Sequence, residues 1–253
     1  MTDAHRVRRA ITVGAGFLLI LAIWELVVAG GWLDTSVPSI GSVLDEFREA
    51  NSRSILFRAM RVTGSEALRG FVLGLVLAAA AGAITVLVPH LKRGLDQLAT
   101  FENAVPLVAL GPILLATLDR QSVPVAMSAV AVFFTLYVGV TTGLSKYSHA
   151  HADLFQVLGA TRRDRLVKMQ LPSAIPVVVT SLKVAIPYAI VGAIIGEWFG
   201  AQRGLGPVML VAMQTYKMPS LWAGAVCAVG LSLLCYGGMA LLESRTDRRF
   251  RAT

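Results

Sequence analysis

The chain has 253 residues, of which 55% are hydrophobic and only 15% are charged, whereas about a quarter of the residues in a soluble domain are charged. Such an apolar chain is not disordered, and its long uncharged stretches exclude an ordinary soluble enzyme. The net charge of +8 would by itself suit a nucleic-acid-binding protein. A chain that has few charged residues, with an excess of basic ones among them, is instead typical of an all-α polytopic membrane protein. We therefore expect no nucleic-acid partner.

Six stretches are apolar and long enough to cross a bilayer, which takes about 20 residues for a core of about 30 Å. In chain order they are residues 10–32, 67–89, 98–118, 121–145, 173–199 and 218–242. The third is the weakest, because it contains Pro106 and Pro112. The first follows several arginines, but it is too long for the apolar region of a signal peptide and lacks a cleavage site. We interpret it as a retained span and residues 1–253 as a single transmembrane domain.

The distribution of Lys and Arg predicts that both termini are cytoplasmic, because cytoplasmic loops carry an excess of these residues. With this orientation, fourteen basic residues fall in inner segments and seven in outer segments. The inner loop 146–172 alone holds Lys146, Arg162, Arg163, Arg165 and Lys168. The loop between the first two spans fits this rule least, because it lies on the outer side and contains several arginines. Acidic residues in the same loop offset their positive charge. We expect a surface helix in this loop.

The sequence lacks the motifs of several enzyme classes. It contains no Gly-x-x-x-x-Gly-Lys-[Ser/Thr] loop for ATP, no His-Glu-x-x-His and no Gly-x-Ser-x-Gly. We therefore assign no catalytic residue and expect no cofactor. His149 and His151 have only Asp153 as a nearby carboxylate, so we interpret them as part of a solvated loop rather than a metal site. Uphill transport by this chain would draw its energy from an ion gradient or from a partner.

The inner loop 146–172 has the pattern of two short helices. Residues 150–158 form the first, which Gly159 interrupts, as a glycine with positive φ would. Thr161 caps the second together with Asp164, in the manner of a capping box. Pro172 ends this helix and opens the next span. The residues alone leave two interpretations open: a basic hairpin on anionic lipid headgroups, or a docking element for a cytosolic partner.

The same loop resembles the "EAA" loop of ABC importer permeases, which holds the coupling helix that docks on the ATP-hydrolysing subunit. The matching pattern comprises Asp153, Leu154, Phe155, Gly159, Ala160, Thr161, Leu171, Pro172 and Pro176. Leu154 and Phe155 stand where the family usually has two alanines. This difference implies a roomier groove in the partner or a shifted docking helix.

Other segments resemble the same family in chain order. They are Trp24-Glu25-Leu26, Gly70-Phe71, the proline-punctuated run from Pro106 to Pro112, the run from Thr180 to Ala185, and Glu197 followed by Gly204-Leu205-Gly206. Together they are similar to the nitrate, sulfonate, taurine and pyrimidine-precursor branch. The resemblance implies a type I importer permease fold in the bacterial cytoplasmic membrane. It also implies that a substrate-binding protein, periplasmic or lipid-anchored, delivers a small polar or heteroaromatic nutrient.

The partners that this resemblance implies are two ATPase subunits, a second permease copy forming a homodimer, and membrane lipid. An ion-coupled secondary carrier or channel is the alternative function, and it would need no ATPase. An integral membrane enzyme is disfavoured by the missing motifs. Uptake that needs the ATPase would distinguish the first function from the second.

Charged and polar residues within spans are costly and are functional candidates by default. On the candidate translocation pathway or its gate we place Glu102, Asn103, Pro106, Lys183, Tyr188 and Glu197. Tyr188 would alternatively pack within the protein, and three of the others also have an alternative role. Glu102 would face water near the inner interface, Lys183 would serve a structural interface, and Glu197 would pin the Gly-Leu-Gly loop.

Overall fold

The computed structural model describes residues 3–31, 36–147, 153–155 and 157–250, and over these ranges the chain forms helices and no strand. The chain divides into two compact units, Met1–Phe57 with Val208–Val226 and Arg58–Pro207 with Cys227–Thr253. Among the described residues, five helices are apolar and long enough to cross a membrane, and a bent helix pair raises the number to six. The expected all-α polytopic fold is therefore confirmed.

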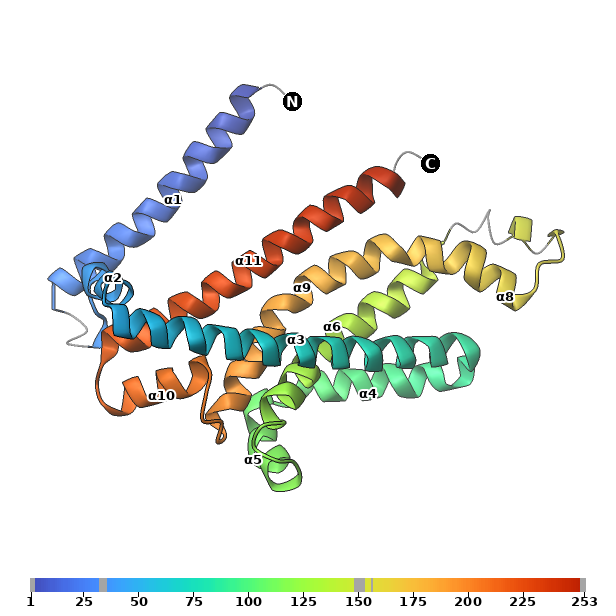
Figure 1. Cartoon of the computed structure of the whole chain (residues 1–253). Coiled ribbons are helices and arrows are strands. Elements are labelled where there is room, and N and C mark those ends of the chain that lie inside the picture. Colours follow the sequence, from blue (N-terminus) through green and yellow to red (C-terminus); the bar gives the residue numbers. More distant parts are fainter. Residues whose placement is uncertain (1–2, 32–35, 148–152, 156, 251–253) are drawn as a thin grey trace. The chain divides into compact units, whose positions relative to one another are not determined.

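The first unit contains the N-terminal helices. It comprises α1 (Asp3–Ala29), α2 (Ile40–Arg48), the first turns of α3 (Ala50–Leu87) and parts of α10 (Leu205–Gln214) and α11 (Met218–Phe250) (Figure 1). Helix α2 is the surface helix expected between the first two spans, and Ser39 caps its N-terminus. Glu25 accepts a hydrogen bond from the Ile40 N–H over 2.8 Å, and the Trp24 indole donates to the Pro38 carbonyl over 2.8 Å. These bonds tie the end of α1 to the start of α2.

The core of the second unit is the pair α6 (Val123–Ser145) and α9 (Leu171–Trp198). Glycines allow the two backbones to approach closely. A Cβ added to Gly192 would lie 2.8 Å from the Met127 carbonyl oxygen, and one added to Gly143 would lie 3.1 Å from the Ala174 Cα. Because positions early in α6 meet positions late in α9, the two helices run antiparallel.

Helix α3 packs against α6 in the same way but in the parallel direction. A Cβ on Gly70 would lie 2.4 Å from the Ser128 Cβ, and one on Gly82 would lie 2.4 Å from Val140 Cγ1. The Ser128 hydroxyl donates to the Ala67 carbonyl over 3.2 Å. The second unit therefore has three tightly packed helices at its centre, with α6 contacting both others.

The expected third span, residues 98–118, falls on two helices rather than one. These are α4 (Lys92–Ala104), which follows the short 3-10 helix η2 (Pro89–Leu91), and α5 (Leu107–Thr117), and together they bend by 99°. The bend lies at Val105, whose backbone is extended (φ −74°, ψ 125°), as the residue before a proline prefers. Asp96 fixes α4 to α6 by accepting a hydrogen bond from the Tyr137 hydroxyl over 2.7 Å.

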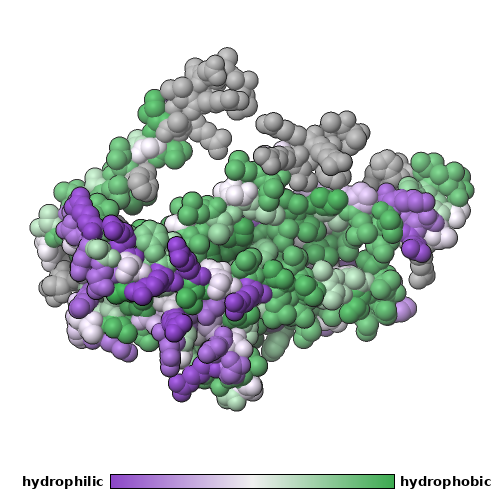
Figure 2. Space-filling view, viewed as in Figure 1, coloured by the Kyte–Doolittle hydropathy of each residue, from purple (hydrophilic) through white to green (hydrophobic). Residues whose placement is uncertain are grey.

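The helix surfaces are suited to lipid. Large apolar side chains such as Leu73, Val76, Leu77, Ile84 and Leu87 are exposed along α3. The surface over α3 is mostly hydrophobic toward its C-terminal end (Figure 2). An exposed apolar surface of this kind is what a membrane-spanning helix requires.

Candidate functional site

The candidate coupling loop begins with a short helical segment. Residues 153–155 and 157 are helical, and they include Asp153, Leu154 and Phe155. Residues 150–152 and 156 of the helix expected over 150–158 lie outside the described residues, as do His149 and His151, and Leu158 lies in the turn that follows. Gly159 follows with φ +67°, the left-handed conformation expected of it. The Ala160 N–H donates to the Phe155 carbonyl over 2.9 Å, which is the hydrogen bond of a Schellman motif.

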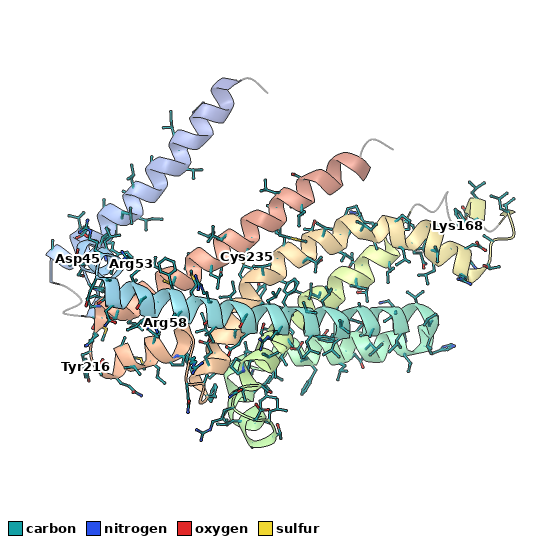
Figure 3. The ribbon with its side chains drawn as sticks, viewed as in Figure 1. Asp45, Arg53, Arg58, Lys168, Tyr216 and Cys235 are labelled. Carbon is teal, nitrogen blue, oxygen red and sulfur yellow. The ribbon has the colours of Figure 1, made fainter. Side chains whose placement is uncertain are left out.

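Thr161 and Asp164 form the capping box that their spacing predicts. The Thr161 hydroxyl accepts a hydrogen bond from the Asp164 N–H over 3.1 Å and donates to Asp164 Oδ2 over 2.5 Å. The same carboxylate oxygen accepts from the Thr161 N–H over 3.3 Å. Lys168, labelled in Figure 3, adds an ion pair to Asp164 at 2.7 Å. Helix α8 (Arg162–Arg165) therefore begins at a well-defined point.

The prediction that Pro172 ends this second helix is wrong. Helix α8 continues through a π-helical turn, η3 (Leu166–Gln170), directly into α9. Proline has no N–H, so Pro172 leaves the Lys168 carbonyl without its usual donor four residues on. The wider π turn, in which the Leu171 N–H donates to the Leu166 carbonyl, carries the helix past this position.

An apolar face is exposed on the first helical segment. Leu154, Val157 and Leu158 are 52%, 84% and 71% exposed, and spacings of three and four residues place them on one side of a helix. Sequence reasoning missed Val157 and Leu158 as candidates, although this spacing was available as a signal. The other expected loop residues are also at least partly accessible: Asp153, Phe155, Gly159, Ala160, Thr161, Leu171 and Pro172.

A buried polar network lies at the C-terminal end of α9. Glu197 is 1% exposed; its Oε1 accepts from the Thr63 hydroxyl over 2.6 Å, and its Oε2 accepts from the Gly206 N–H over 2.5 Å. The Thr63 hydroxyl in turn accepts from the Leu205 N–H over 2.8 Å. These contacts agree with the interpretation in which Glu197 holds the Gly-Leu-Gly loop. Thr63, on α3, is the partner that sequence reasoning missed.

Gly204 shows why this loop starts with glycine. Its φ is +119°, a conformation that side chains rarely adopt. A Cβ at this position would also lie 2.3 Å from the carboxyl carbon of Glu197. Both the backbone geometry and the close approach of the carboxylate therefore require a glycine.

The remaining pathway candidates lie apart from one another. Glu102 and Asn103 are in the last turn of α4, immediately before the bend at Pro106. Glu102 is half-buried, and its Oε2 has no hydrogen-bond partner among the described residues. Tyr188 is 51% exposed on α9. Three of the expected pathway residues therefore lie close to the bend, whereas Tyr188 lies on a different helix.

Lys183 forms an ion pair with a residue of another helix. Its ammonium group pairs with Glu243 of α11, and Glu243 also accepts from the Thr180 hydroxyl over 2.7 Å. The ammonium lies 5.5 Å from the ring centroid of Tyr236, within reach of a cation–π interaction. The arrangement favours the structural alternative for Lys183. Within the described ranges, no group of three His, Cys, Asp or Glu side chains could hold a metal ion.

Helices of this number, length and surface define a polytopic membrane protein, and comparison with known proteins gives its family. Residues 70–248 match the family described as binding-protein-dependent transport system inner membrane component, and the chain belongs to that family. It is therefore a permease component of an ABC importer, a transport protein rather than an enzyme. Such permeases work with an ATPase and a substrate-binding protein.

Named relatives cover most of the chain. It is 26% identical to the formylaminopyrimidine transport permease ThiX of Halalkalibacterium halodurans, over 90% of this chain and 91% of that protein. It is 22% identical to the putative aliphatic sulfonates permease SsuC of Bacillus subtilis, over 90% and 83%. An inward-facing structure of the MetNI methionine ABC transporter matches 78% of this chain and 99% of that chain, with a TM-score of 0.67 at 16% identity. This likeness shows a shared fold.

Proposed function

We propose that the chain forms the translocation pathway for a small polar or heteroaromatic nutrient, and that an ATPase subunit docks on loop 146–172. The observation that supports docking is the exposed apolar face formed by Leu154, Val157 and Leu158. An amphipathic helix that lays such a face into a groove is a common recognition mode. The basic residues of α8 follow directly and suit an acidic rim on the partner.

The proposed assembly follows the family. Two copies of this chain, each a single transmembrane domain of residues 1–253, would pair as a homodimer above two ATPase subunits. Both termini would lie in the cytoplasm. A periplasmic or lipid-anchored substrate-binding protein would deliver the nutrient from outside, and lipid would cover the exposed helix surfaces. The named relatives handle a pyrimidine compound and aliphatic sulfonates, which supports a small polar or heteroaromatic substrate.

The helix that follows the loop supplies a mechanical link. Because α8, η3 and α9 are continuous, a displacement at the docked end moves the helix as one body. From Leu171 to Glu197 the helix rises about 39 Å at 1.5 Å per residue, which exceeds the bilayer core of about 30 Å. Movement of the docked end during ATP-driven closure of the ATPase pair would thus be transmitted along α9 to the loop that Glu197 holds, as in other rigid-body switches.

The pathway residues are proposed in two groups. Glu102, Asn103 and Pro106 lie at the break between two helices, where backbone groups are freed and polar side chains gather, as they do at transporter pathways. Lys183 and Glu197 have internal partners, so we assign them to positioning rather than to contact with substrate. Tyr188 remains a candidate because its ring is exposed on α9.

The experiment is reconstitution in proteoliposomes with the ATPase and the binding protein. The double variant V157S/L158S removes the apolar face and leaves the turn at Gly159 intact. We expect it to insert normally but to lose most of the ATP hydrolysis stimulated by the liganded binding protein, together with uptake. Leu91→Ser, at an apolar residue outside the loop that is 52% exposed, is the control. Normal stimulation and uptake by V157S/L158S would contradict docking at this loop.

A further inference from the structure

An open polar pocket of about 410 Å³ lies between the start of α4 and the end of α6, within the second unit. Two lysines and three hydroxyl side chains line it: Lys92, Lys146, Thr141, Thr142 and Ser145. Lys92 is the first residue of α4, and Lys146 follows the last residue of α6. The volume is within the range of about 300–1,000 Å³ that is usual for small-molecule sites. The pocket therefore has the size and the polar groups that a small charged group requires.

The two lysines give the pocket a positive charge that the protein neutralises only in part. Lys92 Nζ lies 2.7 Å from Asp96 Oδ2, and Asp96 also accepts a hydrogen bond from the Tyr137 hydroxyl of α6. The Lys92 ammonium is therefore held in position, and it keeps further N–H donors for a second partner. Lys146 is exposed and forms no ion pair with another residue of the described ranges. An anion in the pocket would give Lys146 a partner.

The hydroxyl groups of the wall divide into one donor and two acceptors. The Thr142 hydroxyl has no hydrogen-bond partner among the described residues, so its hydrogen is available to a ligand. The Thr141 hydroxyl already donates to the Tyr137 carbonyl over 2.9 Å, and the Ser145 hydroxyl donates to the Thr141 carbonyl over 2.9 Å. Because a hydroxyl carries one hydrogen, these two oxygens can only accept. The pocket therefore suits a ligand that has both an anionic group and hydroxyl donors.

The segment that leads into the pocket has an apolar surface. Leu87 and Val88, at the end of the membrane-length helix α3, and Leu91, directly before Lys92, are all exposed. In the proposed orientation this segment and both pocket lysines lie at the inner side of the membrane. Anionic lipids of the cytoplasmic leaflet bind in basic pockets between helices at this depth. A lipid with its headgroup in the pocket would thus have an apolar helix surface beside it for its acyl chains.

We propose that this pocket binds the headgroup of an anionic phospholipid that carries hydroxyl groups, such as phosphatidylglycerol. The phosphate accepts hydrogen bonds from the two lysines and from Thr142, and the bonds from the charged ammonium groups are the stronger ones. The headgroup hydroxyls donate to the Thr141 and Ser145 oxygens. The bound lipid joins the start of α4 to the end of α6, directly before loop 146–172. This role goes beyond the proposed transport function and takes from it only the orientation of the chain.

The test measures lipid binding at this pocket in the permease–ATPase complex, in nanodiscs of zwitterionic phosphatidylcholine. The two native cysteines are replaced by alanine, and a fluorophore is attached to the cysteine of Leu91→Cys. Phosphatidylglycerol with brominated acyl chains quenches this fluorophore when it occupies the pocket. We expect saturable quenching, with binding about fivefold weaker in Lys92→Gln and in Lys146→Gln, the effect of one lysine beside an anionic lipid. Lys217→Gln, at an exposed lysine outside the pocket, is the matched control and keeps the full affinity.

Brominated phosphatidylethanol tests the part played by the hydroxyls, because it has the same charge as phosphatidylglycerol but no headgroup hydroxyl. The pocket should prefer phosphatidylglycerol about fivefold, as one or two hydrogen bonds would give, and Ser145→Ala should reduce that preference. Lys92→Arg keeps the charge and should bind phosphatidylglycerol like the wild-type lysine.

Three results would overturn the proposal. The first is equal quenching by brominated phosphatidylglycerol and brominated phosphatidylcholine, or by brominated phosphatidylglycerol and brominated phosphatidylethanol. The second is the same loss of affinity in Lys217→Gln as in Lys92→Gln, which would show attraction to the protein surface in general. The third is displacement of the lipid by soluble glycerol phosphate, which would assign the pocket to a free phosphate ester.

Discussion

Replacing Thr63 by valine removes one hydroxyl that serves two partners at the end of α9. The hydroxyl donates to Glu197 Oε1 over 2.6 Å and accepts from the Leu205 N–H over 2.8 Å, and the residue is fully buried. Valine has almost the same shape, so the change opens no cavity. It leaves the Glu197 carboxylate with one donor fewer and the Leu205 N–H without its acceptor.

The size of the effect follows from these two contacts. A typical hydrogen bond contributes about 0.5–1.5 kcal/mol, and a buried unpaired N–H costs about 1–3 kcal/mol. The two contacts share one hydroxyl and do not add fully, so we expect the free energy of unfolding to fall by about 2–4 kcal/mol. At about 2–4 °C per kcal/mol for a chain of this size, Tm falls by about 4–16 °C.

The assay is thermal unfolding of the purified permease in nanodiscs, followed by intrinsic fluorescence. Thr63→Ser keeps the hydroxyl and should unfold close to the wild-type temperature. Ser65→Ala is the matched control, because the Ser65 hydroxyl donates to the Val62 carbonyl on an exposed side of the same helix. The reasoning is refuted if Thr63→Val unfolds with the wild type, or if Thr63→Ser is as unstable as Thr63→Val.

Three further predictions concern packing, charge and the loop. Gly192→Ala should lower the free energy of unfolding by about 1–3 kcal/mol, whereas Gly237→Ala, with open space around it, should not lower it; thermal unfolding checks both. Lys183→Met should lower Tm by leaving Glu243 unpaired, and the double variant with Glu243→Met should recover most of the loss; equal Tm values in single and double variants would contradict this. Thr161→Ala should weaken the capping box by about 0.5–2 kcal/mol and speed amide exchange around residue 164, with Thr161→Ser unchanged.

The loop features predicted from sequence are those that depend on neighbouring residues. Gly159 takes the left-handed conformation and Thr161 pairs with Asp164, because each depends on residues at most a few positions away. The wrong prediction that the second helix ends at Pro172 also came from a rule about neighbouring residues. Proline usually ends a helix, and nothing in the sequence signals that a π turn will carry the helix through.

The contacts that sequence reasoning missed join distant segments. Glu197 and Gly206 are close in sequence, so their contact could be anticipated, but Thr63 lies 134 residues before Glu197. Nothing in the sequence around a single threonine on an apolar helix predicts its hydrogen bond to Glu197.

Site-directed cross-linking tests the central claim, that an ATPase subunit docks on loop 146–172. In a background with Cys227 and Cys235 replaced by alanine, single cysteines are introduced by V157C, L158C and, as a control, L91C. A short bifunctional maleimide is then applied to the assembled complex, with one cysteine present in the groove of the ATPase. The account predicts a permease–ATPase adduct for V157C and L158C whose yield changes on adding ATP, and little for L91C. Equal yields for all three variants, or none for V157C and L158C, would contradict it.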